Sequence, residues 1–109
     1  MANVYKNAKV DFTNTDNTTV YTVPSNSRAI LKNILVSDDS GSGDSITATL
    51  TDASAAIFSL FKSKTIGANA TTELITQPII LQESEILKAQ ATTAGRLHMV
   101  VSLLEINRD

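Results

Sequence analysis

Residues 46–51 of the chain read Ile-Thr-Ala-Thr-Leu-Thr. The apolar side chains of Ile46, Ala48 and Leu50 alternate with threonines, which is the period of two expected when one face of a strand is buried. Threonine is β-branched and favours extended backbone. A polar loop, Asp38–Asp44, precedes the segment and contains two of the chain's four glycines. This pattern predicts a half-buried β-strand.

Similar short runs recur along the sequence, separated by turn-forming residues. The predicted strands cover residues 4–12, 19–23, 28–37, 46–51, 55–62, 71–75, 79–81, 86–91 and 96–106. The polar segment Thr13–Thr18 predicts a hairpin between the first two strands, and residues 28–37 and 96–106 are predicted central strands. No convincing amphipathic helix separates the runs. We therefore expect an all-β fold, an antiparallel β-sandwich of eight or nine strands with a jelly-roll-like topology, in a single domain spanning residues 1–109.

Composition narrows the function classes. The chain has 109 residues, of which 42% are hydrophobic and 18% charged, and a net charge of -2. It contains no cysteine and one histidine, His98, which excludes cysteine metal sites and histidine-pair metal sites. Because no Lys/Arg cluster and no run near the ~18 apolar residues of a spanning helix occurs, we expect no nucleic-acid and no membrane partner. The N-terminal residues also lack the apolar core of a secretory signal.

Two features of the sequence could carry metal binding or catalysis. The acidic loop Asp38–Asp44 could gather carboxylates around Ca²⁺, but it lacks the order of ligands in a calcium hand, so a solvated turn is the better interpretation. His98 lies between Leu97 and Met99 in a predicted strand, and no G-x-S-x-G motif accompanies it. We expect His98 to be an exposed or interface-facing residue, and we expect neither a cofactor nor an enzymatic activity.

Two of the predicted strands are apolar on both faces. In the first, Ile30, Ile34 and Val36 fall on one face by strict alternation, and Leu31 and Leu35 on the other. In a small two-layer sandwich, one face of each strand normally contacts water. Either loops cover the second face, or this face serves self-association or docking. The candidate assembly residues are Val4, Tyr5, Leu31, Leu35, His98, Val100, Leu104 and Ile106.

The order of the segments resembles a group of small virion structural proteins of tailed bacteriophages. The resemblance is carried by Val23-Pro24, Ala29–Val36, Ala68–Ala91 and Leu97–Ile106, and it spans nearly the whole chain. It implies a non-enzymatic particle component with a β-sandwich fold, and it brings no catalytic motif. Such proteins are either capsid decoration (cement) proteins or accessory proteins of the neck, tail or fibres.

The first hypothesis is therefore a cement protein that binds the outer shell of a virion assembled in the host cytoplasm. Its partners would be the major capsid protein or other virion proteins, and a homotrimer is favoured. Residues 1–7 and 107–109 are candidate contact arms. The alternatives are a neck, tail or fibre accessory protein, or a carbohydrate- or receptor-binding module that uses loops Asp38–Asp44 and Thr92–Gly95. The low content of aromatic residues, 5%, counts against carbohydrate binding.

Overall fold

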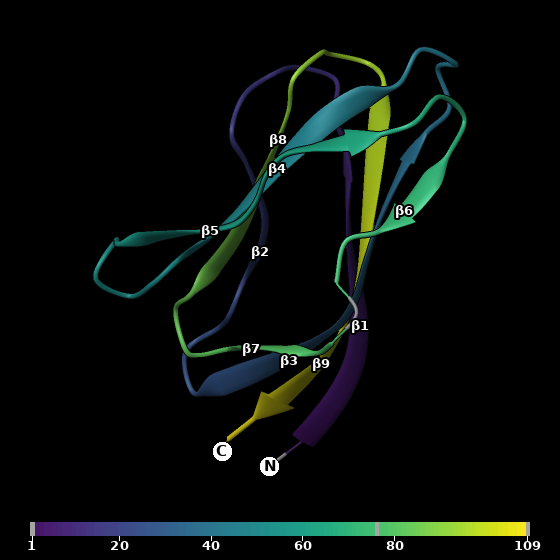
Figure 1. Cartoon of the computed structure of the whole chain (residues 1–109). Coiled ribbons are helices and arrows are strands. Elements are labelled where there is room, and N and C mark those ends of the chain that lie inside the picture. The colour runs from purple at the N-terminus through teal and green to yellow at the C-terminus, as the bar shows by residue number, and fades with distance from the viewer. Residues whose placement is uncertain (1, 76, 109) are drawn as a thin grey trace.

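The computed structural model describes residues 2–75 and 77–108, and in this part of the chain nine strands form two antiparallel sheets (Figure 1). The strands are β1 (Ala2–Asp11), β2 (Thr18–Thr22), β3 (Ser27–Asp38), β4 (Asp44–Thr51), β5 (Ile57–Ile66), β6 (Thr71–Glu73), β7 (Ile79–Leu81), β8 (Ile86–Ala91) and β9 (Leu97–Asn107). Sheet A has the order β1-β9-β3, with β6 and β7 both on the far edge of β3. Sheet B has the order β2-β8-β4-β5. The expectation of an all-β sandwich is confirmed.

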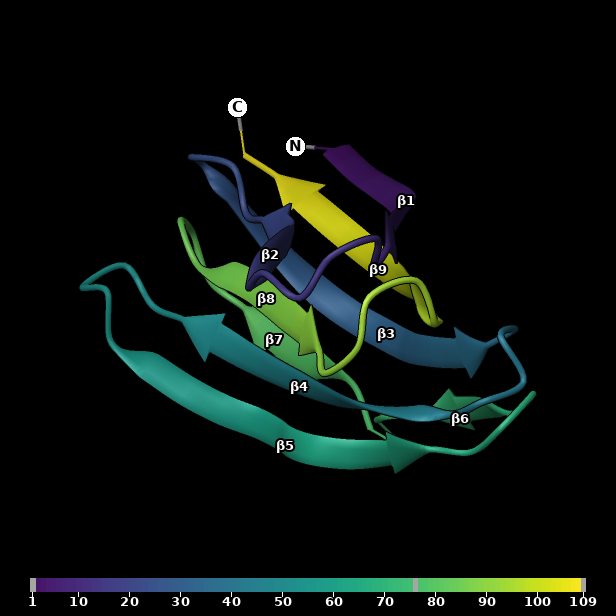
Figure 2. The same cartoon turned by 90° about the horizontal axis from the view of Figure 1, so that it is seen from above.

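The strands pair as if the chain were one long hairpin, and this gives the jelly-roll topology. β1 pairs with β9, β2 with β8, β3 with β6 and β7, and β4 with β5. The long hairpin is rolled up so that β3 also pairs with β9, and β4 with β8. This nested order is that of a two-sheet jelly roll. Figure 2 shows β1, β9 and β3 of sheet A side by side, and β8, β4 and β5 of sheet B side by side.

The predicted hairpin between the first two strands is wrong. β1 lies in sheet A and β2 in sheet B, so the segment between them crosses from one layer to the other. Ala2 to Asn7, within the predicted contact arm at residues 1–7, pair with β9 as part of β1, so this segment is ordered within the domain, and its contact with a partner stays a prediction. The pairing of Ala2 with Asn107 brings the start of β1 beside the end of β9 (Figure 1).

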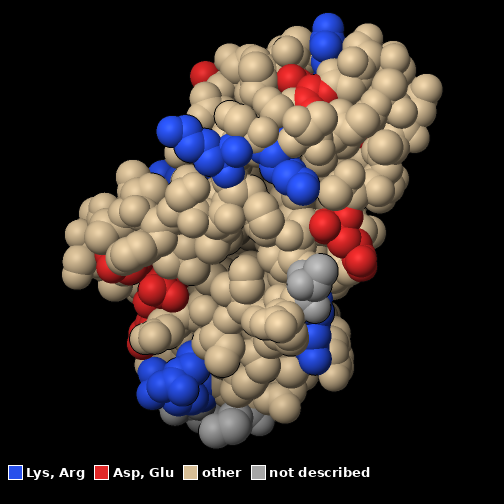
Figure 3. All heavy atoms as spheres, in the orientation of Figure 1, with Lys and Arg blue, Asp and Glu red and all other residues tan. Residues whose placement is uncertain are grey.

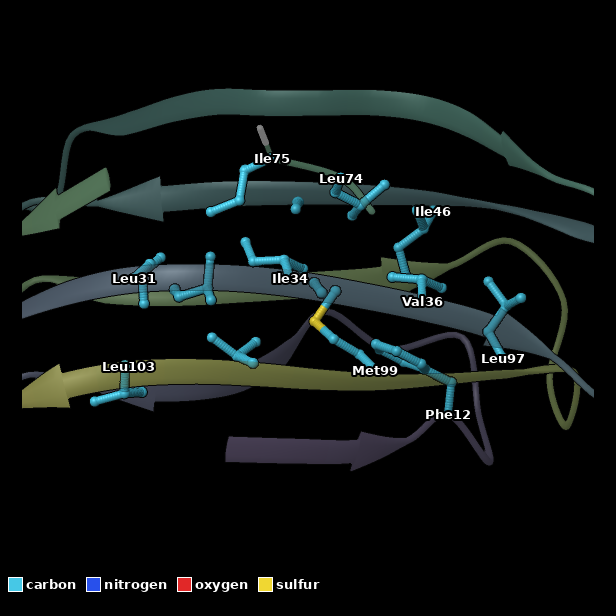
Figure 4. Close-up of a cluster of buried hydrophobic side chains, with 14 of the residues drawn as sticks. Phe12, Leu31, Ile34, Val36, Ile46, Leu74, Ile75, Leu97, Met99 and Leu103 are labelled. Carbon is cyan, nitrogen blue, oxygen red and sulfur yellow. The ribbon is translucent and has the colours of Figure 1, made fainter. Parts of the chain in front are cut away.

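The core lies between the two sheets. Ile46 of sheet B faces Val36 of sheet A (Figure 4), and both side chains are fully buried. Ala48 and Leu87 of sheet B and Ile34 and Met99 of sheet A are fully buried in the same cluster. Phe12, the residue after β1, closes the core at one end with an exposed fraction of 2%. Burial of each large side chain contributes roughly 1.5–3 kcal/mol. Residues 2–75 and 77–108 include no helix long and apolar enough to cross a membrane.

A β-bulge in β3 changes which residues point into the core. Leu31 pairs with Leu103 and Asn33 with Ser102, so the register shifts at Lys32. Two successive residues of the bulged strand then oppose one position of the partner, which reverses the alternation beyond them. Leu31 is therefore buried together with Ile34 and Val36, while Ile30 and Leu35 share the opposite face. The predicted face assignment, with Leu31 beside Leu35, is wrong for this reason.

Candidate assembly surface

We call the face of sheet A that points away from the core its outer face. Directly paired residues of neighbouring strands lie side by side on the same face of a sheet. Tyr5 pairs with Leu104, Leu104 with Ile30, and Ile30 with Ile80. These four apolar residues lie side by side across β1, β9, β3 and β7, and we call them the apolar row. Tyr5 is 77% exposed and Ile80 63% exposed, whereas Leu104 and Ile30 are half-buried.

Further rows of paired residues run parallel to the apolar row. On one side of it, Ile106 pairs with Asn3 and Arg28. On the other side, a polar row of Asn7, Ser102 and Asn33 comes first, at the level of the bulge. A shallow hollow of about 370 Å³ lies there, lined by Tyr5, Lys6, Asn7, Lys32, Ser102 and Leu103.

Beyond the polar row lies a mixed row of charged and apolar residues. It consists of Lys9, Val100, Leu35 and Glu73, in the order β1, β9, β3 and β6. Its two charged residues, of opposite sign, occupy the two edges of the sheet. The last row contains Asp11, His98, Ser37 and Thr71.

Sheet B presents a different outer face. Thr19, Lys88, Thr49 and Ser59 form a paired row across β2, β8, β4 and β5. These side chains carry hydroxyl or amino groups that water can solvate, as expected for the wet face of an antiparallel sheet. The next row of sheet B contains Thr22, Ile86, Thr51 and Ile57, and Ile57 is 68% exposed. That row alternates threonine with isoleucine, whereas all four members of the apolar row are apolar, so the outer face of sheet A is the candidate assembly surface.

Most of the candidate residues predicted from the sequence lie on this surface. Those that share the outer face of sheet A are Tyr5, Leu35, His98, Val100, Leu104 and Ile106. Leu31 does not, because the bulge turns it into the core. Val4 pairs with the buried residue Glu105 and so lies on the inner side of β1, at the open edge of the sandwich, where it is 37% exposed.

Two residues of the apolar row, Ile30 and Ile80, are not among the assembly residues predicted from the sequence. Strict alternation groups Ile30 with Ile34 and Val36 and not with Leu35, because it takes no account of the bulge between them. Ile80 lies in the uninterrupted apolar run Ile79-Ile80-Leu81, which has no alternation to indicate an outward residue. Only the pairing of β7 with β3 identifies it.

His98 lies between two carboxylates at one end of the surface. Its Nε2 atom is 3.2 Å from Asp11 Oδ1 and its Nδ1 atom is 3.6 Å from Asp39 Oδ1. The imidazole is 41% exposed, as the sequence suggested for a strand residue on a surface. Because each ring nitrogen faces a carboxylate, neither is placed to take a proton from a nucleophilic hydroxyl, as a general base would.

A buried acidic residue joins the sheets at the opposite end. The Tyr21 hydroxyl of sheet B donates to Glu105 Oε2 at 2.5 Å, and Lys6 Nζ donates to Glu105 Oε1 at 3.1 Å. Burial raises the pKa of Glu105, but the hydrogen bonds from Tyr21 and Lys6 outweigh burial, so its pKa lies below the ordinary value. Burial, and then the bond to Glu105, raise the pKa of Tyr21. The cluster ties β1, β2 and β9 together.

The acidic loop after β3 is organised by one carboxylate. Asp38 is 3% exposed and accepts hydrogen bonds from the Ser40 hydroxyl and from the backbone amides of Ser40, Gly43 and Asn69. The Ser40 hydroxyl lowers the pKa of Asp38 most; burial opposes this effect, and the three amides add to it. Gly43 has a φ of 72°, and a Cβ there would lie 3.0 Å from the Ile66 carbonyl oxygen. The carboxylate thus holds two loops together.

The loops proposed for a binding module do meet at this end. The Thr93 amide donates to Asp44 Oδ2 at 2.7 Å, and Arg96 Nη1 donates to the Gly43 carbonyl at 3.0 Å. The first of these loops borders an open hollow of about 460 Å³, whose lining residues are Ser42, Gly43, Asp44, Ser45, Thr65, Ile66, Gly67, Ala68 and Arg96; residues 92–95 do not line it. None of these lining residues is aromatic, so the hollow offers no stacking platform for a sugar ring. Among the described residues, no group of three or more acidic or histidine side chains is arranged to hold a metal ion.

The charged residues do not form a field of one sign on the face seen in Figure 3. Basic and acidic side chains there are interspersed among uncharged residues. A surface of this kind lacks the clustered positive charge that phosphate backbones require.

Comparison with known proteins places the fold but not the family. No protein-family model and no curated protein matches the chain. Among solved structures, a chain from the acidic stable capsid of Helicobacter pylori bacteriophage KHP30 is similar, with a TM-score of 0.59 and 11% identity over 99% of this chain and 95% of that one. A chain from Bacillus endospore appendages, described as disulfide-linked pili, has a TM-score of 0.58 and 10% identity over 98% of this chain and 89% of that one. The chain thus shares its β-sandwich fold with proteins of a phage capsid and of a pilus.

Proposed function

We propose that this chain is a non-enzymatic structural protein of a tailed-phage virion, folded as one domain over residues 1–109, which acts by contacting neighbouring subunits of the particle, copies of itself included, and uses the outer face of sheet A for such a contact. The observation that carries the proposal is the apolar row from Tyr5 to Ile80, which spans the sheet and leaves both of its end residues more than half exposed. Exposed apolar surface that spans a sheet is typical of protein–protein contacts.

Two further observations support the proposal. The sequence of segments resembles small tailed-phage virion proteins, and one of the similar folds belongs to a phage capsid. The geometry of His98, with a carboxylate at each nitrogen, offers no general base, which favours a role without catalysis. Fold similarity alone does not assign a function.

Within the virion, we propose a capsid decoration or cement role, with the major capsid protein as partner and assembly in the host cytoplasm. The nine strands of the described residues all belong to the sandwich, and no element among them extends as a shaft, which favours a surface cap over an elongated fibre. A neck, tail or fibre protein is the alternative. The two differ in copy number, because a shell offers one binding site per capsid subunit or cluster of subunits.

The experiment is absolute quantification of this protein by mass spectrometry in purified virions, with the major capsid protein as internal standard. A decoration protein is expected at a copy number of the same order as the capsid protein. A few copies per particle would replace the decoration role with the neck or tail role. A level no higher than that of contaminating host proteins would overturn the virion proposal altogether.

A further inference from the structure

The outer face of sheet A is complementary to itself. Its columns run in the order β1, β9, β3 and β6/β7. A two-fold axis parallel to the strands, between β9 and β3, would place each β1 of one copy over the β6/β7 column of a second copy, and each β9 over β3. Sheets that pack face to face keep their strands roughly aligned, within about 30°, and this axis satisfies that condition.

With this axis, each row of one copy meets the same row of the other. Tyr5 meets the partner's Ile80, and Leu104 meets the partner's Ile30, so the apolar row covers itself. In the mixed row, Val100 meets the partner's Leu35. Lys9 at one edge meets the partner's Glu73 at the other edge, and this ion pair occurs twice because the contact is two-fold.

An alternative two-fold axis, along the polar row, gives a poor match between the two surfaces. A two-fold axis perpendicular to the strands, along the polar row, would place the apolar row over the mixed row. Tyr5 would then face the partner's Lys9, and Ile80 would face the partner's Glu73. Burying charged groups against apolar side chains without a partner is unfavourable. The distribution of charges therefore favours the axis parallel to the strands over the axis along the polar row. The parallel axis also places Ile106 over the partner's Arg28, but Arg28 is exposed near the strand ends, where its guanidinium group can stay in water while its aliphatic stem packs against Ile106.

The polar row does not oppose this arrangement. Asn7 and Ser102 line the hollow of about 370 Å³, and Asn33 pairs with Ser102 beside it, so there is room for water between the two copies. Interfaces commonly retain such water without becoming weak. The exposed Lys32 beside the hollow keeps its hydration there.

We infer that the outer face of sheet A binds a second copy of this chain in a two-fold pair, with Tyr5 against Ile80 and Lys9 against Glu73 across the contact. The inference rests on the proposed role of this surface in assembly, and it replaces the trimer favoured by the sequence with a pair. The capsid partner would then contact the pair elsewhere.

The experiment measures the solution mass of the protein by light scattering after size exclusion, over a dilution series. Tyr5→Ala should raise the dissociation constant of the pair at least about tenfold, because a buried aromatic residue often dominates an interface. The matched control is Phe58→Ala, which removes a 54% exposed aromatic side chain from sheet B and should leave the mass unchanged.

Charge reversal tests the axis. Lys9→Glu alone and Glu73→Lys alone should each weaken the pair about tenfold, because each creates two like-charge contacts. Mixing the two variants should restore pairing, since every contact between them joins opposite charges. Lys88→Glu, the same charge change on the outer face of sheet B, is the control and should have no effect.

A wild-type protein that is monomeric at all concentrations would overturn the inference, and so would a trimer. A dimer insensitive to Tyr5→Ala, or one not restored by mixing, would also overturn it, because its interface would lie elsewhere. None of these results bears on the proposal that the protein is a component of the virion, because its copy number in purified particles tests that proposal separately.

Discussion

Tyr5 and Ile80 lie at opposite edges of sheet A, yet they belong to the same row of side chains, joined by Leu104 and Ile30. They are the two most exposed members of that row. The neighbouring strands shield the middle of the row, and within the described residues nothing comparable shields its ends. The apolar character of this face is therefore a property of the whole sheet, produced by four strands that are distant in the sequence.

Because of the bulge in β3, we expect two leucines of that strand to contribute differently to the free energy of unfolding. Leu31→Ala should lower the free energy of unfolding by about 2–5 kcal/mol, because Leu31 is fully buried and its truncation leaves a cavity. Leu35→Ala removes the same atoms from the outer face and should cost less than half as much. Urea denaturation of both variants at equal, low protein concentration measures the difference. Equal losses would show that both side chains lie in the core.

The same bulge marks the limit of what the sequence could predict. Alternation located nearly all strands, because one buried face leaves a period of two that is visible in residues such as Ile46, Ala48 and Leu50. Alternation does not reveal an inserted residue, so the face of Leu31 was predicted wrongly and Ile30 was missed.

The sequence pattern also could not predict which strands pair with each other. The polar segment Thr13–Thr18 indicates a turn, but a turn does not say whether the next strand stays in the same sheet. Here β1 pairs with the last strand, β9, and its contacts are almost a whole chain length apart. The chemistry at Glu105 was missed for the same reason, because its partners Tyr21 and Lys6 come from distant strands.

The Glu105 cluster should be important for stability. Glu105→Gln removes the charge that Tyr21 and Lys6 bind, and we expect a loss of about 1–3 kcal/mol in the free energy of unfolding. Glu83→Gln is a matched control: the amide oxygen of Gln can still accept the hydrogen bond from the Asn26 backbone amide, and the substitution removes only the exposed ion pair with Arg108 at 3.4 Å, which contributes at most about 1 kcal/mol. Guanidinium denaturation compares the two. Similar losses would mean that the buried cluster adds nothing beyond a surface pair.

Acid should destabilise the protein through Asp38 and Glu105. The fold lowers the pKa of both carboxyls below their ordinary values of 3.8 and 4.5, so the unfolded chain takes up protons first as the pH falls. The free energy of unfolding should therefore be constant above about pH 5 and decrease below it, until the folded state is protonated as well. Thermal unfolding between pH 6 and pH 3 measures this, with Asp38→Asn expected to show a shallower decrease. A melting temperature independent of pH would contradict the assignment.

The most direct test of the two-fold pair uses the absence of cysteine from the chain. Lys9→Cys and Glu73→Cys change only the edges of the surface and leave the apolar row intact. In the inferred pair these two positions face each other across sheets about 10 Å apart, whereas equal positions of the two copies lie three strands, or about 14 Å, further to the side. A bismaleimide that spans about 8 Å should therefore cross-link a mixture of the two variants but neither variant alone. A mixture of Lys88→Cys and Glu73→Cys should give no product. Cross-linking of either edge variant with itself, or no cross-linking in the mixture, would contradict pairing through the outer face of sheet A.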